Sequence, residues 1–168
     1  YAFKATLKKR FQLKFDETLL RTALRYGEDN YLVLETVADV YRLQAKPEEA
    51  ITYYKQALEV APYGPSVLKL ALFASYLEAN RIKDARELAK EMISSDKFLE
   101  FWGQLCLIYI ETINGEKISS SQMYKEFLEK NKISPEDLLR KIETSPMATR
   151  EYWVLSLIHI SEPTRQLQ

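Results

Sequence analysis

Cysteine, histidine and glycine are scarce in this chain of 168 residues, and each scarcity excludes a class of site. Cys106 is the only cysteine, which excludes an internal disulfide and a zinc site built from several cysteines. His159 is the only histidine, so a catalytic or metal site that depends on histidine has almost nothing to build on. Neither common glycine-rich phosphate loop occurs. We therefore expect no catalytic residue, no cofactor and no metal, and predict that the chain is not an enzyme.

An excess of charge of one sign is also lacking, as are long apolar runs. Lys plus Arg and Asp plus Glu each number 24, which gives no general attraction to nucleic acid or to acidic lipids. No run of about 18 apolar residues and no signal-peptide pattern occurs, so we expect no membrane span and a cytoplasmic location. Because the sequence begins with Tyr1 rather than methionine, we expect a fragment whose upstream signal could be missing.

The spacing of the apolar residues predicts helices along the whole chain. Apolar residues recur at helical intervals, strand-like alternation is rare, and Pro47 and Ser134-Pro135 mark helix starts. We therefore predict an all-α protein. The expected helices cover residues 2–13, 16–26, 31–44, 47–60, 65–79, 82–95, 98–113, 120–130, 135–144 and 147–157.

A repeat of slightly more than thirty residues runs through this helical pattern. Tyr41, Tyr76 and Tyr109 are separated by 35 and 33 residues. The set Leu34, Val37, Ala38 and Tyr41 recurs as Trp102, Leu105, Cys106 and Tyr109, with the same i, i+3, i+4, i+7 spacing. A helical hairpin that cannot bury its apolar face alone must pack on a copy of itself. The repeat therefore predicts stacked hairpins.

Small, aromatic and proline residues stand at fixed places within residues 31–64. They are Ala38, Tyr41, Ala50, Tyr54, Ala57 and Pro62. In this spacing the segment resembles a tetratricopeptide repeat (TPR). Phe73 and Met92 in the second copy, and Ile118 and Gln122 in the third, depart from the family pattern. The resemblance implies a right-handed α-α superhelix, a TPR-like solenoid, of about three to four repeats with C-terminal capping helices.

The resemblance also implies how the chain is divided. We expect a partial repeat at 1–30, TPR-like repeats at 31–64 and 65–98, a divergent repeat at 99–131 and capping helices at 132–154. The last segment, LSLIHISEPTRQLQ at 155–168, resembles translated sequencing-adapter DNA and is expected to be a non-native tail.

The resemblance implies a concave groove lined by the first helix of each repeat. The corresponding residues are Glu35, Asp39, Arg42, Leu70, Ala74, Leu77, Glu78, Gln104, Leu107, Ile110 and Glu111. This set is apolar in its middle and acidic at its edges, which suits a protein or peptide partner with apolar anchors and basic residues. Some members of the family bind the C-terminal carboxylate of chaperones through Lys and Asn. Glu35 and Asp39 would repel such a tail, so that partner is disfavoured.

Other interpretations of the same residues remain open. Leu107 and Ile110 could be covered by another part of the parent protein. The basic, aromatic stretch at residues 3–15, which includes Lys8, Lys9, Arg10 and Lys14, is best explained as a solvated helix face. The leading hypothesis is a protein-interaction scaffold. The alternatives are the regulatory repeat region of a larger enzyme, such as a transferase or kinase, and pentatricopeptide-like RNA binding, which the neutral net charge disfavours.

Overall fold

The computed structural model describes residues 17–62, 66–113 and 122–145. All regular structure in these ranges is α-helical, and they contain no strand, which confirms the predicted all-α class for this part of the chain. The chain divides into two compact units, Tyr1–Arg81 and Ile82–Gln168. The boundary falls inside residues 65–98, between the two helices expected there. None of the described helices is long and apolar enough to cross a membrane.

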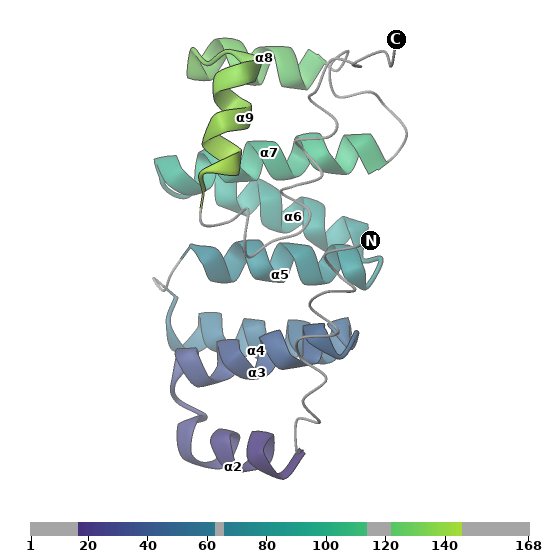
Figure 1. Cartoon of the computed structure of the whole chain (residues 1–168), viewed down its shortest axis with the longest axis vertical. Helices are drawn as coiled ribbons and strands as arrows, with labels where there is room; N and C mark the ends of the chain where they lie inside the picture. The colour runs from purple at the N-terminus through teal and green to yellow at the C-terminus, as the bar shows by residue number, and fades with distance from the viewer. Residues whose placement is uncertain (1–16, 63–65, 114–121, 146–168) are drawn as a thin grey trace. The chain divides into compact units, whose positions relative to one another are not determined.

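Four described helices of the first unit follow one another along the chain (Figure 1). They are α2 (Glu17–Gly27), α3 (Tyr31–Leu43), α4 (Pro47–Val60) and α5 (Val67–Glu78). Each packs on the next: α2 on α3, α3 on α4, and α4 on α5. These bounds agree with the predicted ones to within two residues, whereas the helix expected at 2–13 lies outside the described residues.

Small residues allow α3 and α4 to lie close together. Ala38 on α3 and Ala50 and Ala57 on α4 are each 0% exposed, and so is the large side chain of Tyr54. Alanine at such positions lets helix axes approach to about 8–10 Å, and an aromatic ring fills the space beside them. These four residues therefore pack α3 against α4.

Helices α3 and α5 end in the same way, 35 residues apart. Ala45 and Asn80 have φ of 59° and 58°, in the left-handed region. The next amide in each case, that of Lys46 or Arg81, donates to the carbonyl of Tyr41 (2.9 Å) or Tyr76 (2.8 Å). These bonds satisfy carbonyls that the helix end would leave unpaired, as in a Schellman motif.

The residue after each left-handed position also covers the tyrosine ring. Lys46 Nζ lies 5.8 Å from the ring centroid of Tyr41, and Arg81 Cζ lies 5.0 Å from that of Tyr76. A cation at this distance is attracted to the face of the ring. Two turns of the first unit, 35 residues apart, therefore share both their backbone and their side-chain geometry.

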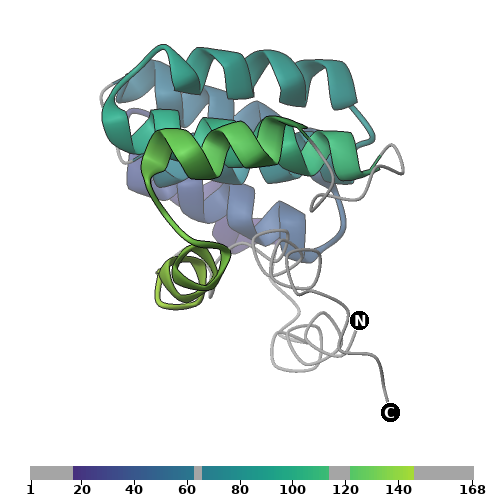
Figure 2. The ribbon, with the colours of Figure 1, turned by 90° about the horizontal axis from the view of Figure 1, so that it is seen from above.

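The second unit contains α6 (Ile82–Ile93), α7 (Lys97–Ile113), α8 (Gln122–Asn131) and α9 (Pro135–Glu143) within the described residues. Helix α6 packs on α7, and α7 on α8. Helices α6 and α7 approach each other closely at Gly103. A larger residue would not fit there, because a Cβ added at Gly103 would lie 2.8 Å from the Ala89 carbonyl oxygen. Helix α9 runs crosswise to α8 (Figures 1 and 2).

Aromatic rings and α9 complete the core of the second unit. Phe101 lies edge-on to Trp102, with 5.7 Å between centroids, and 5.3 Å from Phe127 of α8. Helix α9 buries Leu138 and Ile142. The expected helix at 147–157 and the suspected tail at 155–168 lie outside the described residues.

Replacing Ala50 by leucine should destabilise the first unit, since the added carbons have no space between α3 and α4. We expect the free energy of unfolding to fall by about 1–3 kcal/mol in urea denaturation. The control is Gln56→Leu, which adds an apolar side chain at an exposed position of α4. Equal stabilities of the two variants would contradict the close packing of this hairpin.

Replacing Ala45 by glycine should stabilise the chain, because glycine adopts a positive φ without steric cost. The expected gain is about 0.5–1 kcal/mol in the same assay. The matched control is Ala23→Gly at an exposed position of α2, which should instead cost about 0.5–1 kcal/mol. A loss of stability in both variants would argue against the left-handed turn.

Candidate functional site

The predicted groove residues lie on three helices, and each unit is described by itself. Seven of them belong to α3 and α5 in the first unit: Glu35, Asp39, Arg42, Leu70, Ala74, Leu77 and Glu78. Four belong to α7 in the second unit: Gln104, Leu107, Ile110 and Glu111.

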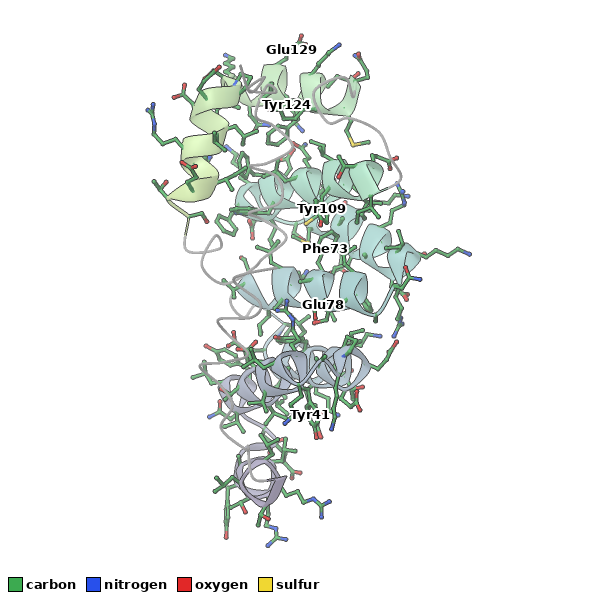
Figure 3. The ribbon with its side chains drawn as sticks, turned by 45° about the vertical axis from the view of Figure 1, so that its right-hand side comes forward. Tyr41, Phe73, Glu78, Tyr109, Tyr124 and Glu129 are labelled. Atoms are coloured by element: carbon green, nitrogen blue, oxygen red, sulfur yellow. The ribbon has the colours of Figure 1, made fainter. Side chains whose placement is uncertain are left out.

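An ion pair joins α3 to α5, although α4 separates them in the sequence. Arg42 Nη2 lies 2.9 Å from Glu78 Oε1, and Arg42 Nε donates to Glu78 Oε2 at 3.4 Å. The exposed fractions of the two side chains are 15% and 37%. Figure 3 labels Glu78 on α5. Two parallel hydrogen bonds fix both the distance and the orientation of the two groups, so this pair places the predicted faces of α3 and α5 next to each other.

A second contact fixes the carboxylate of Asp39. The hydroxyl of Tyr54, on α4, donates a hydrogen bond to Asp39 Oδ1. Burial raises the pKa of Tyr54 well above its usual value of 10.0, and the charge of Asp39 raises it further, whereas that of Arg42 opposes the shift. Tyr54 is therefore protonated and a donor at neutral pH. The buried side chain of Tyr54 on α4 thus positions the carboxylate of Asp39 on α3.

Three of the seven predicted residues in the first unit are buried. Leu70 is 0%, Ala74 3% and Glu35 7% exposed. The predicted apolar middle of the face on α5 is thus not surface, and a partner would meet it only at Leu77, which is partly exposed. The accessible part of the predicted face in this unit consists of Asp39, Arg42, Leu77 and Glu78.

The four predicted groove residues of α7 also include both buried and partly exposed side chains. Ile110 is buried, while Gln104, Leu107 and Glu111 are partly exposed. Arg86 of α6 lies 2.6 Å from Glu111 Oε1 through its Nη1 atom. This acidic residue is therefore already engaged by a cation of the neighbouring helix in the same unit.

Three exposed residues of α3 were missed by the sequence reasoning. Leu32 is 54% and Leu43 41% exposed, and Thr36 between them is exposed as well. Together with Asp39 they follow one another at i, i+4, i+7 and i+11, which places them on one face of the helix. This periodicity is visible in the sequence. It was overlooked because Leu34, Val37, Ala38 and Tyr41 form a stronger stripe on the same helix.

Among the described residues, the other candidates from the sequence form no further site. Cys106 is buried, as expected for a core position. The described residues contain no group of three or more His, Cys, Asp or Glu placed to hold a metal ion. The basic stretch at 3–15 and His159 lie outside the described residues.

Comparison of the chain with protein-family models, with curated proteins and with solved structures finds no match in any of the three. The functional proposal therefore depends on the contacts described above.

A double-mutant cycle measures the link between α3 and α5. We expect Arg42→Gln and Glu78→Gln to show a coupling energy of about 1 kcal/mol, because Arg42 is mostly buried and makes two hydrogen bonds. The matched control is Arg140 and Asp137, whose exposed side chains lie 3.6 Å apart. Its coupling should be no more than about 0.3 kcal/mol. Equal couplings for the two pairs would show that Arg42 and Glu78 do not hold α3 and α5 together.

Proposed function

We propose that the chain consists of tetratricopeptide-like hairpins stacked in a right-handed superhelix, and that it is a non-catalytic scaffold for another protein. The partner contributes a peptide or helix, which binds against the first helices of the hairpins. In the first unit these are α3 and α5. The cytoplasmic location expected from the sequence stays a prediction.

The ion pair between Arg42 and Glu78 is the observation that carries this proposal. It brings two residues assigned to the same face, but to different repeats, to within 2.9 Å. A face assembled from alternate helices offers a partner more length than one hairpin can. The ends of α3 and α5 add support, because in both turns the residue after the left-handed position places a cation over the ring of the tyrosine whose carbonyl it binds.

The charged groups of this face indicate the chemistry of the partner. Arg42 is engaged by Glu78, and Tyr54 directs the carboxylate of Asp39. A partner with Lys or Arg complements Asp39 and Glu78, and an apolar side chain of the partner can pack on Leu77. An acidic chaperone tail fits this set of residues poorly.

The proposal can be tested by selecting random peptides from a display library against the full chain. We expect the enriched peptides to combine apolar side chains with Lys or Arg. Replacing Leu77 by arginine should weaken their binding about tenfold, because it removes an apolar contact and adds a repelling charge. The dissociation constants are measured by fluorescence anisotropy.

Val60→Arg is the control, since Val60 is a partly exposed aliphatic residue on α4, away from the proposed face. Binding to this variant should equal that of the parent chain. If no peptide is enriched, or if Leu77→Arg and Val60→Arg bind the peptides equally well, the proposed face is wrong.

A further inference from the structure

The exposed side of α3 carries an apolar stripe that no described helix covers. Leu32 and Leu43 lie at its two ends, with exposed fractions of 54% and 41%. They are 11 residues apart, which corresponds to about 16 Å along the helix. Thr36 and Asp39 lie between them. We call these four residues the α3 stripe.

The chemistry of the α3 stripe alternates along its length. The hydroxyl of Thr36 donates to the carbonyl of Leu32 at 2.7 Å, so its hydrogen-bonding need is met within the helix. Its methyl group then extends the apolar surface that begins at Leu32. Asp39 is the one charged residue of the stripe, and Tyr54 holds its carboxylate. The α3 stripe thus has an apolar start, an acidic centre and an apolar end.

The negative charge of the stripe is local to Asp39 at its centre. Helices α3 and α5 carry three carboxylates and two cationic groups, and α2, which packs on α3, carries Glu17, Arg21 and Arg25, so these three helices have no net charge (4 − 4 = 0). Arg42 is engaged by Glu78. A cationic group is therefore the complement that the carboxylate of Asp39 favours at the centre of the stripe.

We infer that the α3 stripe binds an amphipathic helix of a partner protein, with apolar side chains at i, i+4 and i+11 and a Lys or Arg near i+7. Two helices packed side by side rise equally per residue, so a partner helix that runs parallel to α3 with this spacing meets Leu32, Thr36 and Leu43 together and places its i+7 residue at Asp39. The partner's cation then lies against Asp39. This inference rests on the proposed function and specifies the partner segment that it would accept.

A second copy of the chain is a poorer occupant of the same surface. In a twofold symmetric pair each α3 stripe would face another with the same acidic centre. The two Asp39 carboxylates would lie opposite each other if the α3 helices were parallel, and each would face Thr36 if they were antiparallel, so neither arrangement offers Asp39 a cation of the stripe. A partner that carries a cation at this place supplies one.

The test uses the full chain and a synthetic Leu/Lys peptide helix with leucine at i, i+4 and i+11 and lysine at i+7. A matched peptide has glutamate at i+7. We expect the lysine peptide to bind at least about tenfold more tightly than the glutamate peptide in titration calorimetry. Replacing both Leu32 and Leu43 by serine should weaken the lysine peptide about tenfold or more.

The control is the double variant Leu19→Ser and Val60→Ser, which alters two exposed aliphatic residues outside the stripe. It should bind the lysine peptide as the parent chain does. Equal loss in both double variants, or equal binding of the two peptides, overturns the inference. If the lysine peptide does not bind but the display library yields binders sensitive to Leu77→Arg, the inference alone fails. An empty library together with no binding overturns the proposed function as well.

Discussion

The close approach of α3 to α4 at three alanines is the constraint on which the rest of the first unit depends. Because Ala38, Ala50 and Ala57 leave no space between the two helices, the large side chain of Tyr54 is fully buried beside them. Its hydroxyl then reaches Asp39 on the facing helix. A larger residue at any of these alanines would move the ring and, with it, the orientation of an acidic group on the surface. Packing inside the hairpin and charge on its face are therefore coupled.

The same constraint affects α5, which packs on the other member of the hairpin. The position of α5 decides whether Glu78 can reach Arg42, and the two hydrogen bonds between them tolerate little displacement. The face that we propose for partner binding is thus the product of two helix contacts and one ion pair. No single helix of the first unit contains it.

The helices themselves were predictable, because the sequence marks both their apolar period and their ends. Asn30 and Ser134 accept hydrogen bonds from the first turns of α3 and α9, and Pro47 begins α4. The environment of α5 was not predictable. Nearly every residue from Leu68 to Tyr76 is buried, and a helix that is apolar on all sides gives no periodic signal that separates a groove from a core. Leu70 and Ala74 were therefore assigned to an open face. The left-handed turn at Ala45 was missed because glycine, the usual residue there, is absent.

The turns after α3 and α5 are alike in backbone but differ in the cation over the tyrosine ring. Lysine can be acetylated, which neutralises its amine, whereas the guanidinium of arginine stays protonated at any pH a protein meets. Acetylation of Lys46 would remove the attraction to Tyr41, while Arg81 would keep its position over Tyr76. One of two nearly identical turns thus carries a chemical sensitivity that its counterpart lacks.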